Sequence, residues 1–308
     1  MKLASSWFFA SAAALSSLGI SFTVHGRQEP PPVPGLQISV HPVMPVLVKN
    51  PQVSIKYCNA SDVGLTITPP VNEYLRPRKD SCALLAKADG KEVAQPKLVQ
   101  GEVIAPSRLE LRPGRTKELH FRLLDFPDRL PDWSQLEVRV MKCWFLRAST
   151  TASFVLYRNP QLKQQLEEGI LQIAVRAEMQ VDPADPQLIV HYCNTGNKDF
   201  LRLLLPRSGR APRELTADVD GAALGAKSET ANQGADPTSD HWSHLLGPGE
   251  SVEVHARLFP VGAVPKDWKR IEVSVKKNNE FEASIYSTLI LERHEPKRLY
   301  GNPPPAKP

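Results

Sequence analysis

The chain has 308 residues, enough for two ordinary domains, and its 41% apolar and 23% charged residues are typical of folded globular proteins. Its formal net charge is +5, from 38 basic and 33 acidic residues that are interspersed without a long run of either sign. This distribution argues against a nucleic-acid-binding stripe. The sequence also contains no Gly-Lys-Ser/Thr phosphate loop, Gly-x-Ser-x-Gly elbow or His-Glu-x-x-His motif, so no familiar catalytic motif assigns it to an enzyme class.

Residues 1–26 have the layout of a secretory signal peptide. Lys2 precedes an apolar stretch from Trp7 to about Val24, and small or permissive residues stand at positions −3 and −1 of a cleavage after residue 26. The alternative is an uncleaved membrane anchor, but several serines interrupt the stretch. We therefore expect an exported protein, secreted or periplasmic, that does not span a membrane once the signal is removed. A proline-rich segment follows at residues 27–35.

An internal repeat at a spacing of 135 positions organises the rest of the chain. The matching pairs are Leu36-Gln37-Ile38 with Leu171-Gln172-Ile173, Tyr57-Cys58-Asn59 with Tyr192-Cys193-Asn194, Pro113-Gly114 with Pro248-Gly249, Glu118-x-His120-x-Arg122 with Glu253-x-His255-x-Arg257, and Asp132-Trp133 with Asp267-Trp268. An ordered series that includes Trp, Cys and His does not arise by chance. It predicts two copies of one unit, residues 36–158 and 171–293.

Each copy is predicted to consist of β-strands. Val53, Ile55 and Tyr57 alternate with more polar residues, and the same period of two recurs in later segments of both copies. Asp-Gly pairs at 89–90 and 220–221 predict tight turns between strands. The fold prediction is therefore an all-β protein with two tandem antiparallel β-sandwich domains.

One motif carries a resemblance to a known fold. A Leu-x-Pro-Gly turn followed by an alternating strand, at residues 111–123 and 246–258, resembles the broad immunoglobulin-like and fibronectin-III-like sandwiches. The resemblance covers both repeats, lacks the Cys–Trp–Cys spacing of antibody domains, and implies a fold without a particular function. Between the copies, residues 159–170 are predicted to form a short helical linker, because Asn159-Pro160 suits a helix start and Gly169 a helix end. A proline-rich tail occupies residues 294–308.

The four cysteines fall into two classes. Cys82 and Cys143 occur only in the first copy, so we predict that they form a disulfide with each other. Cys58 and Cys193 are repeat equivalents, and the alternation places them opposite the apolar side chains. These two are expected to be partly covered free thiols.

A cluster of nitrogen and sulfur ligands is the first candidate for chemistry. His191 and Cys193 project from the same face of a predicted strand, with His241 and His244 later in the chain, and such ligands suit zinc. The first copy has Lys56 in place of His191, and paired Cys-x-x-Cys spacing is missing. Surface residues are the simpler interpretation, so no metal and no other cofactor is predicted.

The Glu118, His120 and Arg122 triplet invites an acid–base interpretation, because all three side chains share a strand face. The ordinary alternative is an exposed charged face paired with Glu137 and Arg139 on a neighbouring strand. We expect the triplet to be framework, so no catalytic residue is predicted.

Two further features have a structural and a functional interpretation. Trp133 and Trp268 are expected to plug the cores, with a ligand-stacking platform as the alternative. Asn59-Ala60-Ser61 is a glycosylation sequon, relevant only in a eukaryotic source.

The two copies differ most between Leu205 and Trp242, where the second copy has a small-residue loop at 228–240. Trp and Arg often anchor interfaces, although a tolerated insertion is the alternative here. The candidate binding residues are Arg207, Arg210, Arg213, His241, Trp242 and His244.

The leading functional hypothesis is an exported, non-catalytic binding or structural module that contacts another envelope or extracellular protein. One alternative is a periplasmic two-domain protein of the chaperone kind. Another is a metal-binding or cryptic enzymatic protein that uses His191, Cys193, His241 and His244.

Overall fold

The computed structural model is all-β in the part of the chain that it describes, which contains no helix and hence none able to cross a membrane. That part comprises residues 33–67, 84–93, 97–98, 109–123, 130, 132–140, 148–159, 171–206, 215–224, 241–257, 265, 267–275 and 283–294. The predicted signal peptide, the helical pattern after Asn159 and the tail beyond residue 294 lie outside these ranges.

Among the described residues, ten strands come from the first copy and nine from the second. The first ten are β1 (Val33–Pro42), β2 (Gln52–Asn59), β3 (Leu65–Ile67), β4 (Leu84–Ala88), β5 (Lys91–Glu92), β6 (Lys97–Leu98), β7 (Leu109–Leu111), β8 (Thr116–Arg122), β9 (Gln135–Val140) and β10 (Ala148–Arg158). The next nine are β11 (Leu171–Ala177), β12 (Gln187–Asn194), β13 (Phe200–Pro206), β14 (Leu215–Val219), β15 (Ala222–Leu224), β16 (His241–Leu246), β17 (Ser251–Arg257), β18 (Arg270–Val275) and β19 (Ala283–Arg293).

The central strand pairings are the same in the two copies. In the first, β1 pairs β2 and β2 pairs β8, while β10 pairs β9 and β9 pairs β4. In the second copy, β11 pairs β12 and β12 pairs β17, while β19 pairs β18 and β18 pairs β14. Even the register is kept, because Leu36 lies opposite Asn59 just as Leu171 lies opposite Asn194. Repeated sequence has produced repeated topology.

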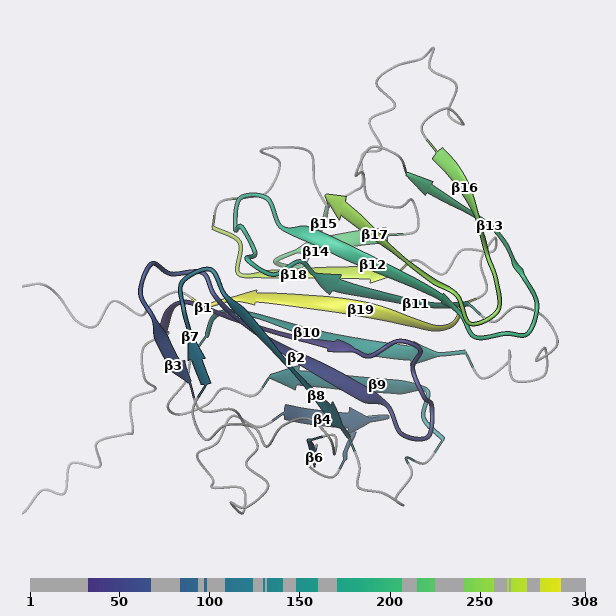
Figure 1. The fold of residues 1–308 in the computed structure, drawn as a ribbon, viewed down its shortest axis with the longest axis horizontal. Coiled ribbons are helices and arrows are strands. Elements are labelled where there is room, and N and C mark those ends of the chain that lie inside the picture. The colour runs from purple at the N-terminus through teal and green to yellow at the C-terminus, as the bar shows by residue number, and fades with distance from the viewer. Residues whose placement is uncertain are drawn as a thin grey trace, which may run out of the picture.

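The prediction of an all-β fold is confirmed, but the structure differs from two tandem antiparallel sandwiches in two respects. The first and last strands of each copy, β1 with β10 and β11 with β19, run parallel. Parallel neighbours need a long crossover, and here almost the whole copy supplies it. In addition, β10 pairs β19 antiparallel over nine positions, which joins the copies into one mixed sheet (Figure 1).

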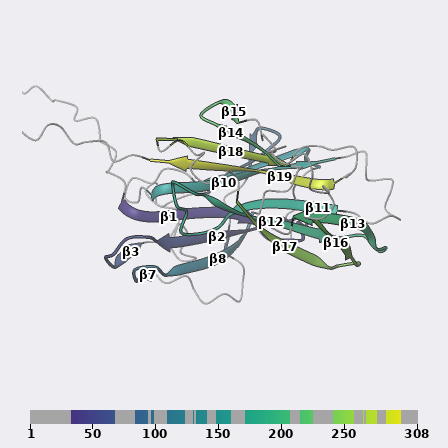
Figure 2. The same cartoon turned by 90° about the horizontal axis from the view of Figure 1, so that it is seen from above.

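The β10–β19 ladder is symmetric about its own centre. Phe154 lies opposite Leu289, and these two residues are themselves repeat equivalents at the spacing of 135. The copies are therefore related by an approximate two-fold axis through this pair. Seen from above, β10, β19, β18 and β14 form one layer, and β2, β8, β12 and β17 lie in the other (Figure 2).

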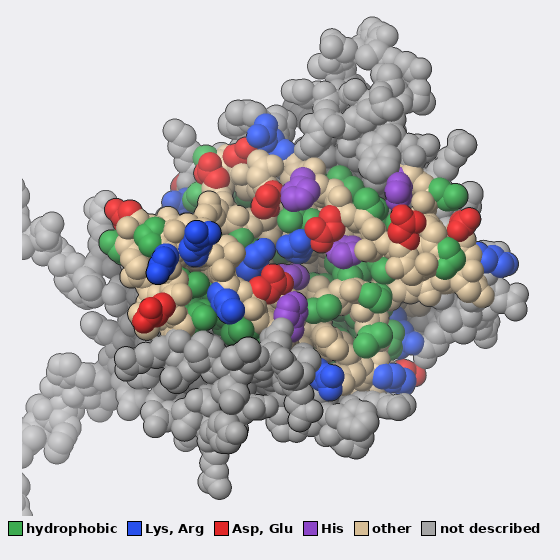
Figure 3. Space-filling model, viewed as in Figure 1, with side chains coloured by type: hydrophobic (Ala, Val, Ile, Leu, Met, Phe, Trp, Pro, Cys, Tyr) green, Lys and Arg blue, Asp and Glu red, His purple; other side chains and the backbone are tan. Residues whose placement is uncertain are grey.

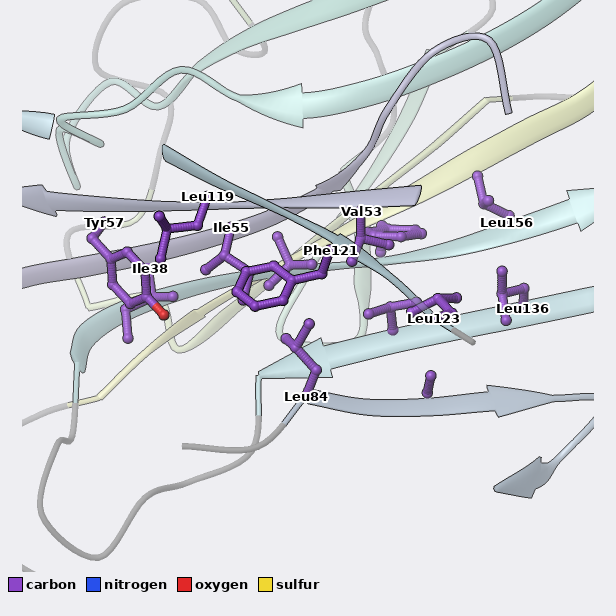
Figure 4. Close-up of a cluster of buried hydrophobic side chains, with 14 of the residues drawn as sticks. Ile38, Val53, Ile55, Tyr57, Leu84, Leu119, Phe121, Leu123, Leu136 and Leu156 are labelled. Carbon is purple, nitrogen blue, oxygen red and sulfur yellow. The ribbon is translucent and has the colours of Figure 1, made fainter. Parts of the chain in front are cut away.

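Two apolar clusters fill the space between the layers. One contains Ile55, Phe121, Leu136 and Phe154 (Figure 4 shows much of it), and the other contains the equivalent part of the second copy. Each large apolar side chain removed from water contributes about 1.5–3 kcal/mol. The clusters also exchange residues, because Ile285 of β19 belongs to the first and Ala152 of β10 to the second. The cores are thus continuous with the joint between the copies.

The predicted Asp-Gly turns are confirmed, and their aspartates do more than turn the chain. Asp89 and Gly90 have φ angles of 48° and 78°, a conformation that Gly and Asp tolerate best. The Asp89 carboxylate also accepts hydrogen bonds from the backbone N–H groups of Ser134 and Gln135, at the start of β9. Asp220 repeats this contact in the second copy. The carboxylate therefore fixes the β4–β5 turn against β9.

Candidate functional site: the polar seam between the copies

Two buried glutamines clamp the copies together reciprocally. The Gln37 amide donates to the carbonyl oxygen of Val181 at 3.0 Å and accepts from the Val181 N–H at 2.8 Å. Gln172 does the same with the backbone of Val46, accepting at 2.7 Å and donating at 3.3 Å. Gln37 and Gln172 are repeat equivalents, and so are Val46 and Val181. This self-complementary pattern is the hallmark of a two-fold, isologous interface.

The clamped backbone belongs to the segments that follow β1 and β11, which we call the first arm (residues 43–51) and the second arm (178–186). Each arm is also fixed within its own copy by a tryptophan. The indole N–H of Trp133 donates to the Val48 carbonyl at 2.9 Å, and that of Trp268 to the Pro183 carbonyl at 2.8 Å. Since both indoles are about 1–2% exposed, the prediction that they plug the cores is confirmed.

The ends of the β10–β19 ladder are closed by equivalent backbone bonds. The N–H of Asn159 donates to the Ser284 carbonyl, and the N–H of His294 donates to the Ser149 carbonyl, both at 2.9 Å. Tyr157 of β10 stacks on Tyr286 of β19, with ring centroids 5.3 Å apart. The seam therefore has two sides: a continuous ladder in one layer, and the glutamine clamps in the other.

Titratable side chains gather on the clamp side. In the first copy, the His41 Nε2 lies 3.2 Å from Glu118, whose carboxylate also accepts a hydrogen bond from Ser54. In the second, Glu253 binds Arg176 at 3.0 Å and His191 Nδ1 at 3.2 Å. Figure 3 shows histidine, acidic and basic side chains close together in the middle of this face.

The pKa directions follow from burial and these partners. Burial lowers the pKa of His41, although the hydrogen bond to Glu118 opposes the change. The same hydrogen bond lowers the pKa of Glu118 to about 2. Burial also lowers the pKa of His191, in part offset by Glu253. Burial acts to raise the pKa of Glu253, but Arg176, His191 and His255 together lower it, and the net direction is down. Both imidazoles therefore favour the neutral form.

Three buried polar atoms on this face have no hydrogen-bond partner among the described residues: His41 Nδ1, His191 Nε2 and Ser39 Oγ. The opposite ring nitrogen of each histidine contacts a carboxylate: His41 Nε2 contacts Glu118, and His191 Nδ1 contacts Glu253. Each of these nitrogens fits the unprotonated position of a neutral imidazole, because protonation would add a buried N–H without a described acceptor.

The sequence predicted that Glu118 lies on an exposed charged face, paired with Glu137 and Arg139 on a neighbouring strand. The predicted neighbours were wrong. Glu118 lies on β8, which pairs β2, whereas Glu137 and Arg139 lie on β9 and form an ion pair with each other. Alternation gave the correct face of β8, but the partner strand depends on topology that no local pattern contains. Glu118 instead binds His41 and Ser54 across β2.

The structure describes two of the four cysteines and part of the predicted metal-ligand group. Cys58 and Cys193 are free and fully buried, more covered than predicted, and burial raises the pKa of both thiols. Within the described residues no three His, Cys, Asp or Glu side chains gather to hold a metal ion, although the His241 side chain is outside this set. Cys82 and Cys143 also lie outside it, so their disulfide stays a prediction.

The candidate binding residues of the second copy adjoin a two-stranded ribbon. β13 pairs β16, with Leu205 opposite Trp242 and Pro206 opposite His241, so these residues lie on a strand rather than in a loop. The equivalent ribbon of the first copy, β3 with β7, pairs over three positions. His244 is half-buried, with Nε2 3.6 Å from Glu250. Arg207, Arg210 and Arg213 lie outside the described residues, as does the loop at 228–240.

The sequon asparagine has a structural role. Asn59 is fully buried, and its amide group donates to the carbonyls of Val63 and Leu111 while its oxygen accepts from Ser61. Asn194 makes the equivalent bonds in the second copy. A glycan on Asn59 is incompatible with this fold.

No family model matches the chain, and no curated protein matches it. Among solved structures, it is similar to the crystal structure of the CupB2 chaperone of Pseudomonas aeruginosa, at 11% sequence identity and a TM-score of 0.15. That match covers 77% of this chain and 91% of the chaperone chain. A TM-score this low carries no argument about function.

Proposed function

We propose that the protein is an exported, non-catalytic binding or structural module of the cell envelope or extracellular space, acting through contacts with another protein. In this proposal residues 1–26 direct export, each copy is an immunoglobulin-like sandwich, and residues 159–170 form a helical connection. Export rests on the N-terminal sequence pattern alone.

The reciprocal pair of glutamine clamps is the observation that best supports this function. Together with the nine-position β10–β19 ladder, it makes the two copies one rigid unit instead of two tethered domains. Glu118, which had an acid–base interpretation, makes framework contacts with His41 and Ser54. A rigid β framework that presents variable loops is a common way to build a binding protein.

Partner contact is assigned to the β13–β16 ribbon of the second copy. Here the second copy departs most from the first, so this region is free to have acquired its own role. β16 of the ribbon contains Trp242 and His244, and Leu245 of the same strand is 56% exposed. Tryptophan is among the residue types that most often anchor interfaces.

The test removes the loop and the aromatic side chain separately. We expect deletion of residues 228–240, and independently Trp242→Ala, to reduce capture of the native envelope partner more than about tenfold, as loss of an interface anchor does. The measurement is quantitative affinity capture on purified envelope fractions, with urea unfolding of each variant as a check on folding. Val63→Ala is the control, because Val63 is an apolar residue that is 58% exposed but lies in the first copy. Unchanged capture by both variants, with folding intact, would exclude the ribbon.

A chaperone-like role is the second candidate, and the edge of β17 favours it. β17 pairs β12 on one side, and no described strand pairs its other side. Such an edge offers backbone donors and acceptors to an extended client segment. Suppression of client aggregation at a 1:1 ratio by the loop-deleted variant would support this role over the binding module.

A further inference from the structure

The two sides of the seam differ in their chemistry. The β10–β19 side is held by backbone hydrogen bonds, which do not titrate in the physiological range. The clamp side contains the buried, uncharged Gln37 and Gln172 together with two ionisable clusters, His41 with Glu118 and His191 with Glu253 and Arg176. A change in charge at His41 or His191 therefore acts on the clamp side. The backbone bonds of the ladder carry no titratable group, and the His294 imidazole lies at the end of the ladder, with Nε2 3.1 Å from the Thr151 hydroxyl.

The charges facing the two histidines are balanced at neutral pH. On the first copy they are Lys56 of β2 and Glu118 of β8, with His120 two positions along β8. On the second they are Arg176 of β11 and Glu253 of β17, with His255 two positions along β17. Two cations thus oppose two carboxylates while His41 and His191 are neutral.

Protonation of the histidines would upset this balance across the seam. Arg176 of the second copy lies close enough to disfavour the charged form of His41, and His41 in turn disfavours that of His191. The His41 and His191 side chains are only 10% and 20% exposed, so water screens the added charge poorly. Each ring would also gain a buried N–H at a nitrogen that has no described acceptor.

We propose that the seam is an acid-responsive joint in which protonation of His41 and His191 releases the glutamine clamps, while the β10–β19 ladder holds the copies together as a hinge. Release frees the first and second arms from the opposite copy. The module then changes from a rigid unit to a hinged one without dissociating.

The pH window follows from the direction of each pKa shift. Burial lowers the pKa of both histidines below the ordinary 6.5, so the closed seam is fully stable above that value and loses stability as the pH falls below it. Glu118 has a pKa of about 2 against an ordinary 4.5, so its contribution is lost only below about pH 4.5. Opening through histidine therefore precedes general acid unfolding.

Hydrogen exchange of the full-length mature protein tests this directly. The backbone N–H groups of Val46 and Val181 donate to the clamp glutamines, so their protection reports clamp closure. Between pH 7.5 and 5.5, after correction for intrinsic exchange, we expect this protection to fall about tenfold, which corresponds to about 1.4 kcal/mol. The β10–β19 amides should keep theirs.

Variants separate the two histidines from other acid effects. His41→Gln with His191→Gln should remove the pH dependence at both amides. His255→Gln is the matched control and should keep it, because His255 is 62% exposed on the same face of β17. His41→Arg places a permanent charge at a position where Arg176 disfavours one, and should open the clamps at pH 7.5.

Three results of the exchange experiment would contradict the proposal. Protection that stays constant down to pH 5.5 in the wild type overturns the proposal, and so does pH dependence that survives in the double glutamine variant. Parallel loss of protection in the β10–β19 ladder would also overturn it, because the seam would then unfold as a whole. None of these measurements depends on the identity of the binding partner.

Discussion

Replacing Trp268 with alanine should destabilise the protein by about 3–5 kcal/mol, the usual cost of removing a large core aromatic. Trp268 is 1% exposed within the second apolar cluster. Its indole N–H also holds the Pro183 carbonyl at 2.8 Å, and so fixes the second arm that carries Val181. The substitution both leaves a cavity in the core and removes the hydrogen bond that fixes the second arm. Urea unfolding at neutral pH, followed by circular dichroism, measures the loss.

Trp133→Ala provides an internal replicate, because the equivalent indole holds Val48 of the first arm. Trp→Phe at either position separates the two effects, since it keeps most of the ring and should lose mainly the hydrogen bond, about 0.5–1.5 kcal/mol. A loss near zero in both alanine variants would contradict the burial of these side chains and restore the hypothesis of a ligand-stacking surface.

Much of each copy could be predicted from local sequence. The period of two in β2 predicts its strand and its buried face, and Asp89-Gly90 predicts its turn, because both depend on residues near each other in the chain. The matching Asp-Trp pairs predicted two equivalent buried tryptophans. These features need only the geometry of a strand or a turn, together with the preference of apolar side chains for the interior.

The seam could not be predicted in the same way. Pairing of β10 with β19 joins residues that local patterns treat as the edges of two domains, and nothing in Phe154 or Leu289 distinguishes an edge strand from a central one. The sequence does contain one signal of the seam, because Gln37 and Gln172 stand at equivalent positions between apolar residues in the two copies. A repeated amide in a strand that is otherwise buried indicates a specific partner, because an unpaired buried amide is costly.

The two-fold symmetry also explains why the histidine cluster could not be predicted from the sequence. His41 belongs to β1 and His191 to β12, and their repeat equivalents are Arg176 and Lys56. Each copy has one histidine and one permanent cation, at exchanged positions. Only the two-fold arrangement brings the four together, so neither copy alone reveals the cluster.

The glutamine clamps give the second large expected effect. Gln37→Leu keeps the side-chain volume but leaves the N–H and carbonyl of Val181 buried without their partner. At about 1–3 kcal/mol for each unsatisfied buried group, the variant should lose about 2–6 kcal/mol. Gln172→Leu should lose a similar amount through Val46. Urea midpoints at constant slope measure both, and Gln52→Leu, on the half-buried start of β2, should stay within about 0.5 kcal/mol.

The double variant decides whether the clamps act as one seam. If the two copies close together, the first substitution already opens the joint, and the second then removes contacts that have been lost. Gln37→Leu with Gln172→Leu should therefore cost less than the sum of the single variants by more than about 0.5 kcal/mol, the usual limit of additivity for independent sites. Strict additivity would mean that each arm docks on its own, and the two copies would then be neighbours rather than a single closed unit.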